Sequence, residues 1–551
     1  MVIATAAPNE AQARFTIGGE DGLEISGELF NFTEIRLGDR DSGPTFNLNA
    51  APGIIAVPGE AFSRQQKYER LNALRTELTL EMVYRGIPHV TPVVRLRPYY
   101  DAAFPIEDRD YGDIGRFWKT NLVEGMHDEW DPVFREVFAD VNFHPLFIRA
   151  GRQIVTWGRS DGVVVLDVVS PRNFRNPLTF EQERFMIPQW MINTTLDMSS
   201  YDWMPGGTEK ELQVIWNLNY LPSRFPGFRA SEEGQHPWTL NVVDFSDQVI
   251  NTQTALFGES SFFDDDNYEG SGGFLSDTEL FVKWRGTVSK GFGPLNNFTY
   301  SFHFAHLYND VPTYELQDRI DLGLAIDIAG PRAAGGGIDF SKHRYQMYGF
   351  SFDKALEFLP GQFQGAVLRG ELAFNKGDRF YEPDLNLRRA DQILYMIGLD
   401  QYLYLTPRSW VETPWFVSFQ FWQDWILRDA GRGKFTNRGT PACDGQPGCG
   451  DKGYIIGGEY GLFNGLRDQR RSIVTLYMFN DFLPGKTLRV EMFGLHEFEK
   501  SGTWLRFVLG YNFTNNFSAR LGTNVIFGNR DSFFGQFDKT DVVFSELKYT
   551  F

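Results

Sequence analysis

The chain of 551 residues is poor in the features that mark several common protein classes. It contains no run of about 18 consecutive apolar residues, which excludes transmembrane helices, whereas the strands of a membrane β-barrel need only alternate. Basic residues are in deficit, 53 against 71 acidic ones, and the net charge of −18 disfavours binding to nucleic acid. The 2 cysteines have no companion Cys or His at the spacing of a metal centre.

Aromatic residues and glycine are abundant instead, with 51 Phe, 22 Tyr, 13 Trp and 55 Gly. Apolar and polar residues alternate with period 2 along the whole chain, most clearly over 74–84, where Arg75, Glu77 and Glu81 share one face. Such segments occupy 23–37, 74–84, 89–100, 133–143, 146–157, 184–198, 211–221, 277–289, 298–308, 343–355, 364–376, 393–405, 415–427, 471–482, 487–498, 503–513, 517–528 and 541–551. The pattern predicts about eighteen strands of a length that suits a tilted membrane strand, although sixteen would also fit.

The lengths of the connections give an independent test of a barrel. If both ends of the chain lie on the periplasmic side, periplasmic turns should be short and outer loops long. The odd-numbered connections are long, as in 38–70 and 222–276, and the even-numbered ones are short, as in Gly86–Pro88 and His144–Pro145; only 499–502 breaks the long series. The sequence therefore predicts an all-β fold, a transmembrane antiparallel β-barrel that forms a single domain.

The two ends of the chain carry signals of export. Residues 1–13 end in Ala11-Gln12-Ala13 and are interpreted either as a remnant of a signal peptide or as a flexible N-terminus, which leaves 14–551 for the barrel. The last strand, with Leu547, Tyr549 and Phe551 on one face, resembles the C-terminal signal of bacterial outer-membrane barrels. That resemblance implies recognition by the barrel-assembly machinery and an integral place in the outer membrane, in contact with its lipid and lipopolysaccharide.

One segment resembles a known family. The sequence from Arg149 to Arg159, RAGRQIVTWGR, follows a strand and precedes Val168-Val-Ser-Pro-Arg172. This is similar to a family of Proteobacterial outer-membrane channel proteins, largely of unknown function, with a GRQ-x-x-x-WG strand end, an inward-folding loop and genes that often neighbour RND-type transporters. Arg159 departs from that pattern, which favours an acidic residue there. Alginate-export barrels are more distantly similar, but the acidic net charge disfavours a polyanion conduit.

Strand parity predicts which side chains line the lumen. Arg149, Gln153 and Trp157 face inward, while Arg152 would face lipid unless a bulge at Gly151 turns it inward, as we expect; the alternative is an Arg152 that snorkels at the interface. The loop 158–183, which carries Arg159 and Asp161, is the expected constriction. Further inward charges are predicted at Arg75, Glu77, Glu81, Arg95, Arg97, Glu279, Lys283, Arg285, Arg369, Glu371, Arg489, Glu491, Arg506, Arg520, Glu546 and Lys548. They require a wet lumen or mutual pairing.

Two smaller features lie in the predicted loops. Cys443 and Cys449, six residues apart in a Gly/Pro-rich outer loop, predict a local disulfide. The cluster Asp264, Asp265 and Asp266 is a weak candidate for Ca²⁺ or Mg²⁺ shared with lipopolysaccharide, with a solvated loop the simpler interpretation.

Ser301, His303 and Glu279 would form a nucleophile–base–acid set, but no local signature supports an enzyme. The sequence thus predicts, without any cofactor, a porin that passes small solutes through a charged, loop-narrowed lumen. The alternative is an outer-membrane component of an export or lipid-trafficking system with a periplasmic or RND-type partner. A homo-oligomer is compatible with both.

Overall fold

The computed structural model describes residues 15–19, 22–37, 70–106, 132–160, 162–173, 182–201, 207–223, 263–264, 275, 277–289, 296–309, 313–317, 337–341, 343–381, 387–407, 413–427, 469–482, 485, 487–529, 532, 534–537 and 540–551. Within these ranges, no helix is both long enough and apolar enough to cross a membrane.

The architecture is a closed antiparallel β-barrel. The main sheet has 20 strands, of which β1 (Phe15–Ile17) and β5 (Tyr99–Asp101) are short additions beside β2 and β3, so that eighteen strands form the wall. In chain order the wall strands are β2 (Leu23–Arg36), β3 (Leu71–Tyr84), β4 (Val90–Leu96), β6 (Phe134–Phe143), β7 (Leu146–Gln153), β8 (Gln189–Asp197), β9 (Glu209–Asn217), β11 (Glu279–Val288), β12 (Phe298–Tyr308), β15 (Arg344–Leu356), β16 (Ala366–Tyr381), β17 (Leu387–Leu403), β18 (Trp415–Leu427), β19 (Arg470–Phe482), β20 (Leu488–Glu497), β21 (Gly502–Asn512), β22 (Phe517–Gly528) and β23 (Val542–Thr550).

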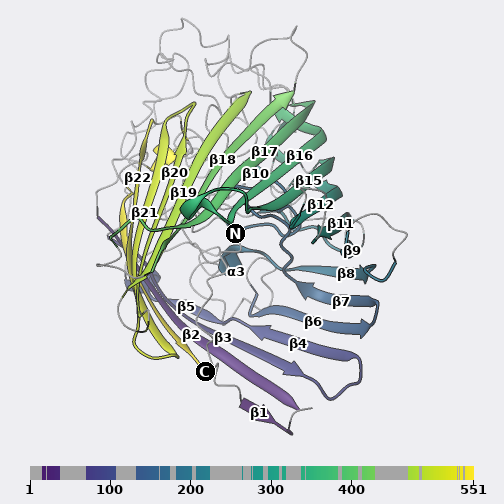
Figure 1. Ribbon diagram of the computed structural model, residues 1–551, viewed down its shortest axis with the longest axis horizontal. Helices are drawn as coiled ribbons and strands as arrows, with labels where there is room; N and C mark the ends of the chain where they lie inside the picture. Colours follow the sequence, from purple (N-terminus) through teal and green to yellow (C-terminus); the bar gives the residue numbers. More distant parts are fainter. Residues whose placement is uncertain are drawn as a thin grey trace, which may run out of the picture.

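The ring closes where the first wall strand meets the last. β2 pairs with β23 from Glu28 opposite Thr550 to Arg36 opposite Val542. Figure 1 shows the purple N-terminal strands meeting the yellow C-terminal ones at one side of the ring. The predicted fold class is confirmed, with eighteen strands and not sixteen.

Short elements lie outside the wall. They are the helical turns α1 (Ala103–Ile106), α3 (Gln182–Phe185), η6 (Gly361–Phe363) and η8 (Phe534–Phe537), and a small sheet of β10 (Phe263–Asp264), β14 (Gly337–Ser341) and β13 (Thr313–Gln317). Of these, α3 lies inside the ring in Figure 1.

Several predicted strand limits agree with the structure to the residue. The ranges 298–308, 415–427 and 517–528 are those of β12, β18 and β22. The largest differences flank the predicted constriction, because β7 ends at Gln153 and β8 begins only at Gln189. The chain leaves the wall at Ile154, although its alternating pattern continues.

The outer surface of the wall carries large apolar side chains. Leu509, Leu521 and Leu547, on three consecutive strands, are about half exposed. An apolar outer band of this kind is what a lipid-facing barrel requires, while polar side chains alternate with it on the inner face. The C-terminal Phe551 is part of this arrangement, since its backbone exchanges hydrogen bonds of 2.8 and 2.9 Å with Gly27.

The hydrophobic core lies inside the barrel. Residues 154–160 and 162–173, here called the inward segment, place Trp157, Val165 and Leu166 at exposed fractions of 5%, 2% and 0%. They pack against wall residues of β8 to β23, so this part of the lumen is filled by protein. The wall residues of this core are Met191, Ile215, Phe281, Ala305, Leu307, Tyr345, Met347, Ala373, Met396, Trp422, Ile473, Tyr477, Phe493, Leu495, Trp504, Ile526 and Val542, joined by Phe534 and Phe537.

Candidate functional site: the barrel lumen

The inward segment is tied to the far side of the barrel by its backbone. The carboxylate of Glu371 on β16 accepts hydrogen bonds from the N–H groups of Arg159 and Leu166, the second at 3.3 Å. Arg369 donates to the carbonyl of Arg159 at 2.5 Å, and the indole of Trp422 on β18 donates to the carbonyl of Val164 at 3.2 Å. Because β16 stands six strands from β7 in a ring of eighteen, the segment crosses the lumen.

The two limbs of the inward segment also hold each other. The Asp167 carboxylate accepts the N–H of Trp157 at 2.8 Å and a guanidinium N–H of Arg172 at 2.6 Å. Ser170 both accepts from the N–H of Val155 and donates to its carbonyl, each at 3.0 Å. These bonds within the segment satisfy backbone N–H and C=O groups in the interior of the barrel, where an unpaired polar group would cost free energy of folding.

A second set of contacts fixes the return of the chain at residues 182–188. Arg184 bonds the carboxylates of Glu77 and, at 2.6 Å, Glu28, and its guanidinium lies 3.6 Å from the ring centroid of Phe30. Arg135 donates to the carbonyl of Met186. Residues 184–186 are thus anchored to β2, β3 and β6.

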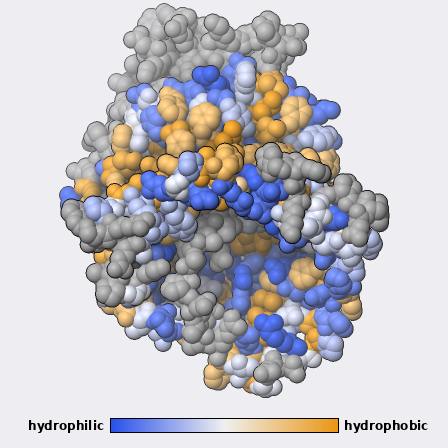
Figure 2. Space-filling view, in the orientation of Figure 1, coloured by the Kyte–Doolittle hydropathy of each residue, from blue (hydrophilic) through white to orange (hydrophobic). Residues whose placement is uncertain are grey.

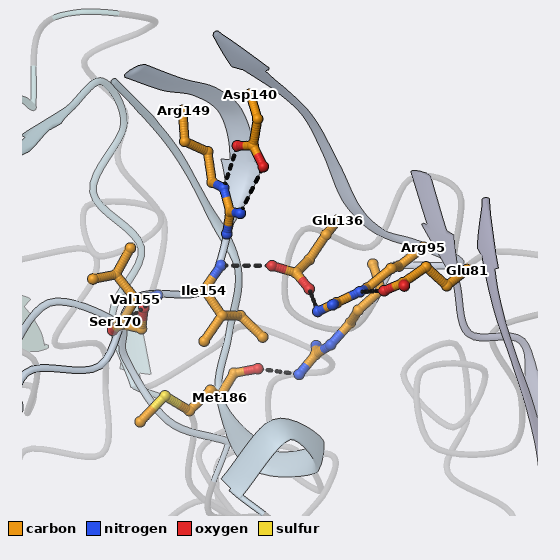
Figure 3. A network of polar contacts seen from close by, with 10 residues as sticks. Glu81, Arg95, Glu136, Asp140, Arg149, Ile154, Val155, Ser170 and Met186 are labelled. Carbon is orange, nitrogen blue, oxygen red and sulfur yellow. Dashed lines mark hydrogen bonds and ion pairs between the residues drawn. The ribbon is translucent and has the colours of Figure 1, made fainter. Parts of the chain in front are cut away.

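The opposite side of the lumen is lined by charges. Arg95 bonds Glu81 and, at 2.6 Å, Glu136, and Glu136 also accepts the N–H of Ile154 at 2.9 Å (Figure 3). Arg149 forms two bonds to Asp140, at 2.6 and 2.8 Å. The same pairing extends to Arg75 with Asp101, Lys548 with Glu28, Arg520 with Glu491 and Glu546, Arg506 with Glu546, and Arg489 with Asp481. These side chains, on β19–β23 and β2–β7, are here called the charged wall.

The structure corrects the expectation for Arg152. The register of β7 with β6 and β8 runs unbroken through Gly151, so the expected bulge is wrong. Arg152 stands opposite Val137 and Trp190, and Trp190 is 42% exposed on the outer face, so Arg152 does not line the lumen. The register shift lies instead on β6 between Phe134 and Glu136, and it turns Arg135 inward.

The other predicted lumen residues occupy varied surroundings. Gln153 is fully buried and donates to the carbonyl of Met191 at 3.1 Å, and Arg97 donates to the carbonyl of Arg184 at 3.3 Å. Arg159 pairs with Asp353 at 3.0 Å. Asp161, Cys443, Cys449, Asp265, Asp266 and residues 1–13 lie outside the described residues, and only the backbone of Asp264 is described, so the predicted disulfide, signal remnant and acidic cluster stay predictions.

Several lumen residues were missed at the level of sequence. Glu136 and Asp140 follow from the alternation of 133–143 and could have been named by parity. Arg184 lies outside any strand, and no local sequence pattern predicts its bonds to Glu28 and Glu77.

The nucleophile–base–acid set considered from the sequence is not assembled. Ser301 Oγ lies 2.7 Å from His303 Nε2 and 2.6 Å from Ser351 Oγ. Glu279 instead accepts from Asn217 at 2.7 Å and from the N–H of Tyr308 at 2.8 Å, and His303 Nδ1 has no hydrogen-bond partner. Without an acid on Nδ1, the three side chains do not form the arrangement of a catalytic triad. The described part of the chain also holds no cluster of His, Cys, Asp and Glu fit to bind a metal ion.

The chain is similar to several proteins of known structure. Acinetobacter baumannii OccAB1 is similar at 10% identity and a TM-score of 0.45, with 99% of each chain covered. Pseudomonas aeruginosa OccK8 (OprE) is similar at 9% identity and a TM-score of 0.44, with 96% of this chain and 97% of that one covered. No curated protein matches the chain. A family model, described as a protein of unknown function and designated DUF1302, spans residues 1–551, so the chain belongs to the DUF1302 family.

Proposed function

We propose that the protein is an integral outer-membrane channel that passes small polar solutes along its charged wall. The observation that carries this proposal is the division of the lumen by the inward segment. The core residues that pack on this segment come from β8 round to β23; among the described residues none comes from β2–β7, where the ion pairs Arg95–Glu136 and Arg149–Asp140 lie.

Solvent exposure supports a wet path on the charged side. The side chains of Arg75, Arg149 and Arg95 are 32%, 32% and 37% exposed although they point inward, whereas Phe281 and Met347 of the apolar side are 0% exposed. Figure 2, in the orientation of Figure 1, shows a hollow at the centre of the molecule with hydrophilic side chains along its edge. Ionised side chains remain partly solvated only where water reaches them.

The charged wall determines what kind of solute fits. Cations and anions alternate along it, as in Glu81, Arg95 and Glu136, so each solute meets both signs of charge. Such an arrangement orients a dipolar or zwitterionic solute across the path and discriminates weakly between simple anions and cations.

Outer-membrane placement is part of the proposal. Support comes from the apolar outer band and from the final strand, where Tyr549 and Phe551 stack with ring centroids 6.2 Å apart. In this setting the barrel-assembly machinery would insert the chain, and lipopolysaccharide would contact its outer face. A disulfide between Cys443 and Cys449 is part of the same proposal, whereas a periplasmic or RND-type partner belongs to the alternative function given below.

Single-channel conductance in a planar bilayer tests the function directly. The purified, refolded barrel is expected to give discrete steps, with a small reversal potential in a salt gradient because the charged wall is balanced. A folded barrel that stays silent would contradict the open path. It would favour the alternative of an export or lipid-trafficking component that needs a partner, for which the large apolar core in the lumen is the supporting observation.

A further inference from the structure

Two cations on the lumen face of β11 have no counter-ion in direct contact. Within the described part of the chain, neither Lys283 nor Arg285 forms an ion pair or a side-chain hydrogen bond, and the Nε of Arg285 is buried without an acceptor. In the charged wall, by contrast, Arg95 bonds two carboxylates and Arg149 bonds one. The lumen thus contains a second group of charges, and these have no direct partner in the protein.

The strands that follow β11 bring no carboxylate beside Arg285. Ladder pairs place Arg285 opposite Ser301 on β12, and Ser301 opposite Ser351 on β15. The two hydroxyl oxygens lie 2.6 Å apart and bond each other. The row reaches an acid only at Glu371 on β16, whose carboxylate is taken up by two backbone N–H groups of the inward segment.

The strand on the other side of β11 supplies one acid. The register of β9 puts Gln213 opposite Lys283 and Glu211 opposite Arg285, while on β12 Lys283 stands opposite His303. Gln213 is already bonded through both ends of its amide. Glu211 attracts the Lys283 ammonium but forms no ion pair with it, so it offsets the charge of the two cations only in part.

A third cation comes from the inward segment. Arg159 and Arg285 both repel the Lys283 ammonium. The side chain of Arg159 pairs with Asp353 at 3.0 Å and stays 43% exposed, so water reaches this position. Lys283 and Arg285, two residues apart on one strand face, have Cα atoms about 7 Å apart. Like charges held this close repel one another, and an anion placed between them removes that cost.

We infer that Lys283, Arg285 and Arg159 form a binding subsite for a small oxyanion, the carboxylate or phosphate group of a solute. A guanidinium offers paired N–H donors that match two oxygens of such a group, and an ammonium adds a flexible point charge. The inference goes beyond the proposed function, because it concerns equilibrium binding and holds whether or not the barrel conducts.

Equilibrium binding to the full chain tests the subsite directly. The refolded barrel in a nonionic detergent is titrated by calorimetry with inorganic phosphate and, in a second arm, with succinate, at low and constant ionic strength. We expect saturable binding of at least one of the two anions, with one site per chain, and the tighter arm identifies the preferred group. Absence of binding in both arms would overturn the inference.

Lys283→Met and Arg285→Gln each remove one charge and keep a long side chain. Each should weaken binding about tenfold or more, because a hydrogen bond to a charged group is lost. Arg489→Gln is the matched control, because Arg489 also faces the lumen but pairs with Asp481 at 2.7 Å, and it should leave binding unchanged. Equal weakening by the control would show that the anion senses only the overall charge of the lumen, which would overturn the subsite.

A variant with the opposite effect separates the subsite from a general loss of folding. Glu211→Gln removes the acid that competes with the anion for Lys283, so it should tighten binding several-fold. Glu491→Gln, whose carboxylate pairs with Arg520 in the charged wall, should not. Unchanged or weaker binding in Glu211→Gln would contradict a site beside Lys283.

Conductance of the same proteins distinguishes failure of this inference from failure of the proposed function. Saturable binding by a barrel that stays silent in a bilayer keeps the subsite and removes the channel. Normal conductance without anion binding keeps the channel and removes the subsite.

Discussion

The attachment of the inward segment to Glu371 is the contact whose loss should change conduction most. Glu371 is 3% exposed and accepts the N–H groups of Arg159 and Leu166. Glu371→Ala removes both acceptors and leaves two N–H groups without them, of which that of Leu166 is buried. A hydrogen bond to a charged group contributes about 1.5–3 kcal/mol, and the longer contact less, so the total loss is about 3 kcal/mol. At 1.4 kcal/mol per factor of ten, the ratio of detached to docked segment rises roughly 10²-fold.

Single-channel recording of Glu371→Ala should therefore show a larger conductance level that is occupied far more often than in the wild type. Glu371→Gln, which keeps one acceptor oxygen, should lie between the two. Glu357→Gln is the matched control, because Glu357 lies at an exposed turn and bonds Asn297, away from the segment. Conductance levels and occupancies in Glu371→Ala equal to those of the control would refute the attachment, provided that both barrels resist unfolding in sodium dodecyl sulfate alike.

Three further predictions concern folding, selectivity and the outer loop. Gly151 has a φ of +137°, and a Cβ there would lie 2.3 Å from the carbonyl oxygen of Val137, so Gly151→Ala should cost at least about 1–3 kcal/mol and lower the urea midpoint of unfolding; an unchanged midpoint would contradict this. Arg95→Ala removes a cation between two carboxylates and should move the reversal potential toward cation preference, whereas a move toward anions would show that these groups do not face the path. If Cys443 and Cys449 are joined, the unreduced protein will take up no thiol reagent under denaturing conditions and will take up two equivalents after reduction.

The wall of the barrel could be predicted from the sequence because its signal is local. Each wall residue faces either the lumen or the outside, and this contrast reverses at every step along the strand. For this reason the limits of β12, β18 and β22 follow from alternation alone.

The departure of the chain from the wall at Ile154 could not be predicted in this way. Ile154 to Trp157 continue the alternation of β7, and only distant contacts, such as that of Trp157 with Gln213, draw them inward. Arg152 was misplaced for a related reason. A glycine within a strand pattern suggested a bulge, whereas the actual irregularity is marked by the adjacent charges Arg135 and Glu136, which cannot both face inward on a regular strand.

The inward segment is held on two sides of the lumen, and the structure indicates how conduction would respond to the loss of each contact. The N–H groups of Arg159 and Leu166 bond Glu371 on β16, whereas the indole of Trp157 bonds Gln213 on β9. The backbone N–H of Trp157 also bonds Asp167, so a change of the Trp157 ring leaves this contact within the segment in place. Loss of the Glu371 attachment should therefore raise conductance, whereas Trp157→Phe, which removes only the bond to Gln213, should change conductance far less. Equal changes of conductance in the two variants would show that the Glu371 attachment does not hold the segment in place.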